Sequence, residues 1–146
     1  MEEGKTQEGL AFLGAALGDG GMPVELRRHL PRTIAFFDAA HAAPVLERHL
    51  LGERSGAVRY RILRGMNRLA TYADAEFDVD LLRRAATSTA EGVFRLVHWR
   101  SVLERGGGER KERTTPGHGL LVQLLRDKEA QAVERLFRLL ALQHRG

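Results

Sequence analysis

The sequence predicts an all-α protein built from short helical hairpins. Apolar residues recur at spacings of three and four, and no stretch alternates apolar and polar residues as a half-buried strand does. The chain has 146 residues, 43% hydrophobic and 29% charged, which suits one globular domain. It contains no cysteine, which excludes disulfides, thiolate metal sites and cysteine nucleophiles. We therefore expect one helical domain over residues 1–146 that is held together by an apolar core.

Four helices are predicted in the N-terminal half. The first covers about 6–18 and ends at a glycine-rich turn. The second begins at Pro23, because proline is tolerated at the first helical position, and Pro31 should kink it. The third and fourth cover about 42–51 and 57–72. The expected buried residues are Leu26, Leu30, Ile34 and Phe37 in the second helix, Val45, Leu46, Leu50 and Leu51 in the third, and Val58, Ile62, Met66 and Leu69 in the fourth.

Residues 78–143 are predicted to form longer helices that cap the N-terminal hairpins. Residues 74–78 form an acidic turn, and Asp78 is of the type that caps a helix N-terminus. The segment 79–105 fits either one long helix or two short ones, because its middle is small and polar. Both alternatives remain open from the sequence.

Residues 106–113 predict a flexible loop, since three glycines are followed there by five charged residues. The last helical segment is expected to start at Thr115-Pro116 and to run to about Gln143. Asp127 is a candidate break within it.

An internal repeat relates the second and fourth predicted helices at an offset of 32 residues, the separation of Leu26 and Val58. Apolar positions align with apolar positions, and arginine aligns with arginine twice. We expect Arg27 and Arg59 to bridge neighbouring repeats. An offset in the thirties is typical of helix–turn–helix repeats, which bury their apolar faces by stacking. The aligned pairs are Leu26 with Val58, Arg27 with Arg59, Leu30 with Ile62, Arg32 with Arg64, Ile34 with Met66 and Phe37 with Leu69.

These features resemble HEAT repeats over residues 23–75, about a third of the chain. The resemblance rests on the pairs Leu26-Arg27 and Val58-Arg59, on Pro31 and on the short helix at 42–51. It implies HEAT-like helical hairpins, a short α-solenoid, with the later helices as a C-terminal cap. It also implies a protein-interaction or scaffold module.

A narrower resemblance concerns the segments 59–69, 119–129 and 134–138. They are similar to the HEAT region of bacterial proteins related to ATP/ADP translocases. The transporter part of those proteins is absent from this sequence, so the resemblance implies an accessory domain of a membrane transporter, or a fragment of one, and not nucleotide transport.

Catalytic and metal-binding motifs are not found. The histidines show no HExxH spacing, the serines lie in no GxSxG motif, and the glycine-rich stretches lack the phosphate-loop pattern. Carboxylates precede arginines by four residues, as Asp80 precedes Arg84, which indicates surface ion pairs. We therefore expect no enzyme activity and no catalytic, cofactor-binding or metal-binding residue.

Positive charge is concentrated in residues 23–69, with nine arginines and four acidic residues, a net charge of +5. Such a segment attracts acidic partners. The candidate residues for partner or phosphate contacts are Arg28, Arg61, Arg64 and Arg68. We expect a protein partner. The alternative is a basic helical-repeat domain that binds nucleic acid through its phosphates, which the scarcity of aromatic residues disfavours.

The setting expected from the sequence is the cytoplasm. No apolar run approaches the roughly 18 residues that span a bilayer. The N-terminus, Met1-Glu2-Glu3, is acidic and differs from a secretory signal. The absence of cysteine is compatible with a reducing compartment.

Overall fold

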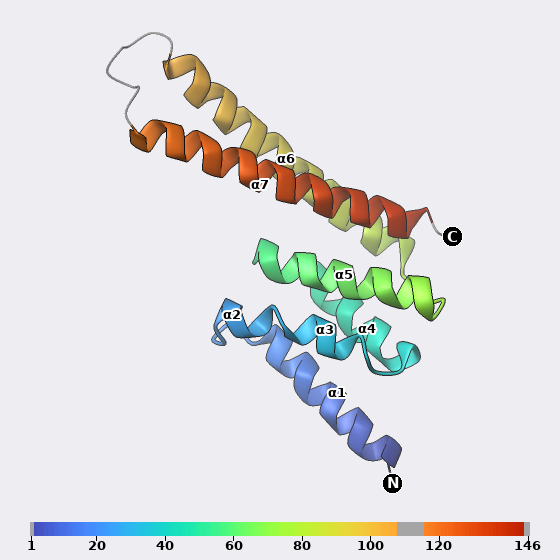
Figure 1. Ribbon diagram of the computed structural model, residues 1–146. Coiled ribbons are helices and arrows are strands. Elements are labelled where there is room, and N and C mark those ends of the chain that lie inside the picture. The colour runs from blue at the N-terminus through green and yellow to red at the C-terminus, as the bar shows by residue number, and fades with distance from the viewer. Residues whose placement is uncertain (1, 108–115, 145–146) are drawn as a thin grey trace. The chain divides into compact units, whose positions relative to one another are not determined.

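The computed structural model describes residues 2–107 and 116–144, and these residues form an all-α structure (Figure 1). Of the described residues, 83% are helical and none lies in a strand, which confirms the all-α prediction. No helix within these ranges is both long and apolar enough to cross a membrane. The helices are α1 (Glu2–Gly18), α2 (Val24–Arg27), α3 (Leu30–Ile34), α4 (Ala39–Leu50), α5 (Gly56–Tyr72), α6 (Val79–Gly107) and α7 (Pro116–Gln143).

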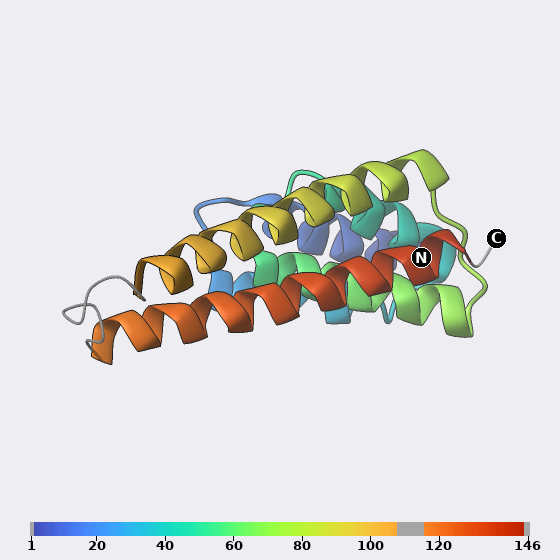
Figure 2. The same cartoon turned by 90° about the horizontal axis from the view of Figure 1, so that it is seen from above.

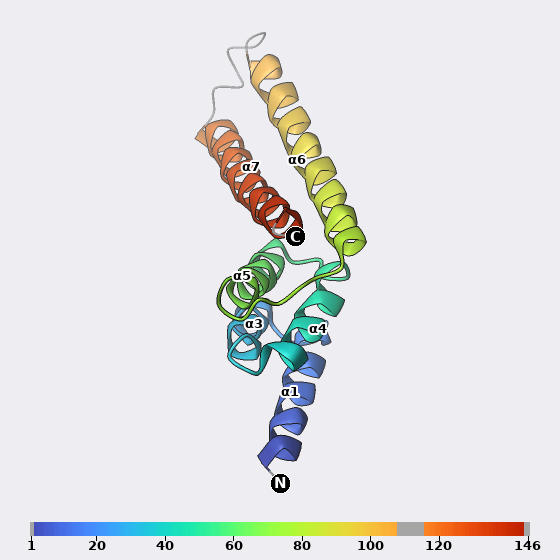
Figure 3. The same cartoon turned by 90° about the vertical axis from the view of Figure 1, so that its right-hand side faces the viewer.

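The chain divides into two compact units. Unit 1 comprises Met1–Ala85 and Arg138–Gly146, and unit 2 comprises Ala86–Phe137. Unit 1 therefore contains α1 to α5, the start of α6 and the end of α7. Within unit 1, α5 packs mainly against α4 and α3, and α1 packs against the same two helices (Figure 3).

The core of unit 1 is built around α5. Val58, Ile62 and Met66 are fully buried and Leu69 nearly so, which confirms the apolar stripe predicted for this helix. Their spacing of three and four places them on one side of the helix. Gly65 lies beside this stripe and allows a close approach between helices, since a Cβ there would lie 3.0 Å from Leu46 Cδ1 and 3.3 Å from the Pro31 carbonyl oxygen.

Local signals set the ends of α5 and the start of α6. The Ser55 hydroxyl caps α5 by accepting from the amide of Val58 at 3.5 Å. After α5, Asp74 adopts a positive φ of 50°, a left-handed conformation that commonly ends helices and that aspartate tolerates. Asp78 caps α6, because its Oδ1 accepts from the amide of Asp80 at 2.8 Å, which confirms the predicted cap.

The prediction of one kinked helix from Pro23 is wrong. The structure has two short helices, α2 and α3, and Pro31 lies in the first turn of α3. Because proline has no amide hydrogen, it is accommodated best where a helix begins, so the chain ends one helix and starts another. The break takes Leu26 out of the predicted stripe, and 59% of it is exposed, whereas Ile34 is fully buried.

The third predicted helix begins earlier than expected. As α4 it starts at Ala39, with the backbone oxygen of Asp38 accepting from the amide of Ala42 at 2.8 Å. Leu46 and Leu50 are fully buried as predicted, but Leu51 is partly exposed, which corrects its assignment to the core. It follows the last residue of α4 and no longer shares the buried face of that helix.

Both long helices of the C-terminal half are continuous. The open question over 79–105 is resolved as one helix, α6, and Asp127 does not break α7. In the predicted loop 106–113, residues 106–107 end α6, and 108–113 lie outside the described residues. Asp80 pairs with Arg83 at 2.9 Å, three residues on, and not with the predicted Arg84.

Unit 2 consists of the parts of α6 and α7 that lie side by side and run in opposite directions (Figure 2). Arg100 of α6 pairs with Glu129 of α7 at 2.6 Å and with Glu104 at 3.1 Å. Glu104 in turn pairs with Arg126 of α7 at 2.8 Å. Hydrogen bonds from Arg126 and from Arg100 lower the pKa of Glu104. These ion pairs connect the two helices within the unit.

A buried ion pair connects three parts of unit 1. Arg27 of α2 binds Glu53, which precedes α5, through contacts of 2.7 and 3.3 Å. Arg27 also donates to the backbone oxygen of Leu17 at the end of α1, at 3.0 Å. Glu53 further accepts from the amide of Ser55 at 2.7 Å, and its backbone oxygen accepts from Arg59 at 3.0 Å. The two arginines aligned by the repeat therefore meet at one glutamate.

His49 of α4 is half-buried beside this ion pair. Burial lowers its pKa from the ordinary 6.5, the charge of Arg48 lowers it further, and Glu53 acts in the opposite direction. The ring occupies space that a side chain at position 18 would need, since a Cβ on Gly18 would lie 2.9 Å from His49 Cε1. Within the described part of the chain, the buried Nε2 of His49 has no hydrogen-bond partner. The folded state therefore favours the neutral ring.

We expect the free energy of unfolding to fall on acidification from about pH 7.5 to about pH 5.5, in part because of His49. In the unfolded state this group titrates near its ordinary pKa of 6.5, so the unfolded chain binds the proton first. Stability is lost as the pH falls through 6.5 towards the lower folded pKa. Urea denaturation at several pH values measures the slope. His49→Gln should flatten this slope, and a slope in His49→Gln equal to that of the wild-type chain would show that His49 is not its cause.

Candidate functional site

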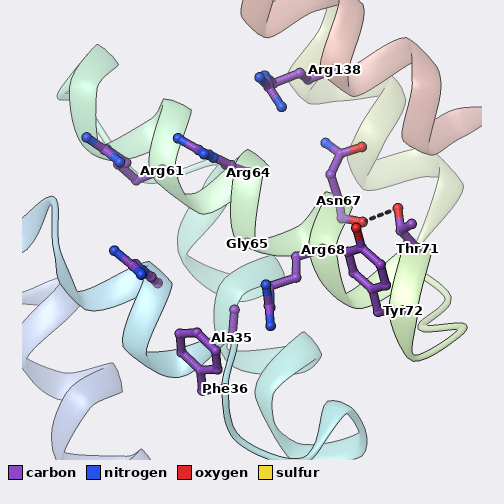
Figure 4. Close-up of a pocket in the computed structure, with 11 residues that line it drawn as sticks. Ala35, Phe36, Arg61, Arg64, Gly65, Asn67, Arg68, Thr71, Tyr72 and Arg138 are labelled. Carbon is purple, nitrogen blue, oxygen red and sulfur yellow. Dashed lines mark hydrogen bonds between the residues drawn. The ribbon is translucent and has the colours of Figure 1, made fainter.

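An arginine-lined cavity in unit 1 is the candidate site. Its volume is about 500 Å³, and it lies between α3, α5 and the end of α7 (Figure 4). We call it the arginine groove. Its lining residues are Arg32, Ala35, Phe36, Arg61, Arg64, Gly65, Asn67, Arg68, Thr71, Tyr72 and Arg138.

Helix α5 supplies three of the five arginines. Arg61, Arg64 and Arg68 are spaced by three and four residues, which places them along one side of the helix. The core stripe of α5 occupies another side, so one amphipathic helix serves both the core and the groove. Arg32 is contributed by α3, and Arg138 by the C-terminal end of α7.

None of the described residues that line the groove is acidic. Over the described part of the chain, no carboxylate forms an ion pair with Arg32, Arg61, Arg64 or Arg68. Arg27 and Arg100, in contrast, each bind carboxylates. These four arginines thus place positive charge in the groove that no carboxylate of the described residues pairs with.

Aromatic rings orient two of the arginines. The Arg68 guanidinium lies over the Phe36 ring, at 4.6 Å from its centroid, and near the Tyr72 ring at 5.7 Å. The Arg138 guanidinium lies 5.1 Å from the Tyr60 ring centroid. Such cation–π contacts are energetically favourable, and they restrict the conformations of the long arginine side chains. Phe36 and Tyr72 are nevertheless 62% and 81% exposed, so both rings can contact a bound partner.

Two polar side chains of the groove form hydrogen bonds to the backbone of α5, the helix to which they belong. Asn67 donates through Nδ2 to the backbone oxygen of Leu63 at 2.9 Å. Thr71 donates through Oγ1 to the backbone oxygen of Asn67 at 2.8 Å, the dashed line in Figure 4. The donors for a ligand therefore come chiefly from the arginines.

The groove offers positive charge and N–H donors. No histidine or carboxylate stands among its described lining residues to act as a general base or metal ligand. Elsewhere in residues 2–107 and 116–144, no group of three or more His, Asp or Glu residues could hold a metal ion. The arrangement suits binding of an anion.

The structure brings together three of the four arginines that the sequence singled out. Arg61, Arg64 and Arg68 line the groove, whereas Arg28 lies exposed at the end of α2 and does not line it.

Sequence reasoning missed Arg138 and the two aromatic residues of the groove. Tyr72 stands four residues after Arg68 on one helix, a spacing that signals contact. For Phe36 and Arg138 no local pattern exists, because they reach the site through tertiary packing.

Comparison with known proteins gives no match. No family model matches the sequence, and no curated protein and no solved structure matches it. The functional argument therefore starts from the geometry of the groove.

Proposed function

We propose that the protein is a non-catalytic interaction module of the HEAT-repeat type, and that its arginine groove binds an acidic segment of a partner protein. The observation that carries the proposal is a set of four arginines that line one cavity of about 500 Å³ and form no ion pair with any carboxylate of the described residues: Arg32, Arg61, Arg64 and Arg68. Unneutralised arginines are favourable where an anionic partner arrives, since the partner then completes the charge balance.

The assignment to a HEAT-like module draws support from the repeat. Ile34 and Met66, which align at the offset of 32 residues, are both fully buried, whereas the aligned pair Leu26 and Val58 differs in burial, since Leu26 is exposed. Arg27 and Arg59, also aligned, both bind Glu53. A scaffold role in the cytoplasm, or as an accessory domain beside a membrane transporter, is compatible with such a module.

Nucleic acid is the second candidate partner. The exposed rings of Phe36 and Tyr72 beside the arginines favour it, because single strands bind where bases stack on aromatic side chains within a basic groove. We rank it second because just two exposed rings line the groove among its described residues.

The test replaces Arg61, Arg64 and Arg68 together by glutamate. We expect the wild-type chain to bind a short labelled polyglutamate peptide in fluorescence anisotropy, and the triple variant to lose about tenfold or more in affinity, because charge reversal turns attraction into repulsion. For DNA we expect a dissociation constant no tighter than about 10⁻⁴–10⁻⁶ M at physiological salt.

The control makes the same change of charge outside the groove, at the exposed Arg28, Arg54 and Arg84. This variant should retain most of the binding. Equal losses in the two triple variants would reject the groove as the site. Tight, sequence-dependent binding of DNA or RNA by the wild-type chain would replace the protein partner with nucleic acid.

A further inference from the structure

The hairpin that α6 and α7 form in unit 2 exposes a group of large apolar side chains (Figure 2). We infer that these side chains form a docking face for a second copy of the chain, and that two hairpins pack together as a four-helix bundle. We call this surface the hairpin face. It consists of Trp99 and Val102 of α6 and Leu120, Leu121 and Leu124 of α7. It belongs to unit 2 and the arginine groove to unit 1, so the inference is independent of the proposed function.

Most of unit 2 has no buried core of its own. Over residues 90–105 and 117–131, where side-chain exposure is described, no residue is buried. In unit 1, by contrast, α4 and α5 contribute fully buried side chains such as Leu46, Ile62 and Met66. Helices with an apolar side are stable when another layer of structure covers that side. Two helices alone do not supply that layer, so the hairpin lacks a partner for its apolar side.

The ion pair between Glu104 and Arg126 and the hairpin face lie on opposite sides of the two helices. Val102 stands two residues before Glu104, which is about 200° around α6. Leu124 stands two residues before Arg126, the same rotation around α7. Because the helices run in opposite directions, equal rotations away from a shared contact lead to the same face of the hairpin. One face is therefore ion-paired, and the other is apolar.

The exposed area of the hairpin face matches what a dimer interface needs. Leu120 is 63% exposed, Trp99 60%, Leu124 49%, and Val102 and Leu121 45% each. Together these fractions amount to about 400–500 Å² of exposed area. A standard interface buries about 800 Å² on each partner, of which about 57% is apolar, or about 450 Å². One hairpin face therefore supplies the apolar part of such an interface.

The same face of a second copy fits in shape and in charge. Helices α6 and α7 have 29 and 28 residues, so a second hairpin of equal length can pack its side-chain ridges along both of them. The described residues of unit 2 carry six basic and five acidic side chains, a net charge of +1, so two copies repel each other little. Contact between identical faces is satisfied by two copies, so assembly should stop at the dimer.

Sedimentation equilibrium of the full chain over a range of concentrations tests the inference. We expect a dimer, twice the mass of the 16.3 kDa chain, with a dissociation constant of about 1 µM or tighter. Trp99 is the single tryptophan of the sequence, so its fluorescence reports on the hairpin face alone. Its emission should shift to shorter wavelength as the dimer forms, because the ring then leaves water.

Leu124→Glu should weaken the dimer by about tenfold or more, because it places a charge in the apolar contact. Leu26→Glu is the matched control, since Leu26 is an exposed leucine of unit 1, and it should leave the dimer unchanged. Circular dichroism confirms that both variants are folded.

A chain that stays monomeric at about 100 µM, far above a micromolar dissociation constant, would overturn the inference. A dimer that Leu124→Glu does not weaken, or that forms without a shift in Trp99 emission, would place the contact elsewhere and overturn it too. Growth beyond the dimer would contradict a closed contact between identical faces. The dimer should persist in about 0.5 M salt, which screens the binding of polyglutamate to the arginine groove. The two proposals can therefore fail separately.

Discussion

Replacing Glu53 by alanine is expected to lower the free energy of unfolding by about 3–5 kcal/mol. The side chains of Arg27 and Glu53 are only 11% and 5% exposed, so the substitution leaves a buried guanidinium without its carboxylate. It also removes the acceptor for the amide of Ser55 at the start of α5. Urea denaturation followed by circular dichroism at 222 nm measures the loss.

Two further variants make this result interpretable. Glu25→Ala removes an exposed acid from the same basic region and should change stability by no more than about 0.5 kcal/mol. The double variant Arg27→Met with Glu53→Leu replaces both charges by apolar side chains and should be more stable than Glu53→Ala, because no buried charge is then left alone. A Glu53→Ala protein as stable as Glu25→Ala would show that the ion pair is not buried in solution.

Replacing Ile62 by alanine should lower the free energy of unfolding by about 2–5 kcal/mol. Ile62 is fully buried on α5, and the surrounding helices cannot close completely over the space that its side chain leaves. Its repeat partner Leu30 is only half-buried, so Leu30→Ala should have a smaller effect than the repeat alone predicts. The same denaturation experiment compares the two variants.

Leu26→Ala is the control for this series, since Leu26 is 59% exposed and its loss should change stability by no more than about 0.5 kcal/mol. Equal effects at positions 26 and 62 would mean that the predicted single helix from Pro23 forms in solution after all. A larger effect for Leu30→Ala than for Ile62→Ala would place the core elsewhere than around α5.

The sequence predicted α5 almost completely and the region before it poorly. Along α5 the apolar spacing, Ser55 and the turn after Tyr72 all agree, so the local pattern specifies the helix. Around Pro31 two outcomes were compatible with the pattern, a kink or a new helix, and packing decided between them. Leu26 was wrongly assigned to the core for that reason, because apolar spacing predicts a buried face only as long as the same helix continues.

The candidate site was predictable to the extent that it lies on one helix. Arg61, Arg64 and Arg68 follow from helical spacing, and they were identified from the sequence. The contact between Arg68 and Phe36, two helices apart in the chain, depends on how α3 packs against α5 and has no local signal. Glu53 was overlooked because a single glutamate in a turn resembles a solvated residue until its burial is known.

The use of α5 for both the core and the arginine groove links folding to ligand occupancy. The groove exists only while α3, α5 and the end of α7 are packed, so the unfolded chain presents no such site. A ligand that binds the folded state alone stabilises it by mass action, by about 2.7 kcal/mol at a hundred times its dissociation constant. The rise in the melting temperature of the chain when an anion is added therefore reports binding directly. The size of this rise can rank ligands without any activity assay.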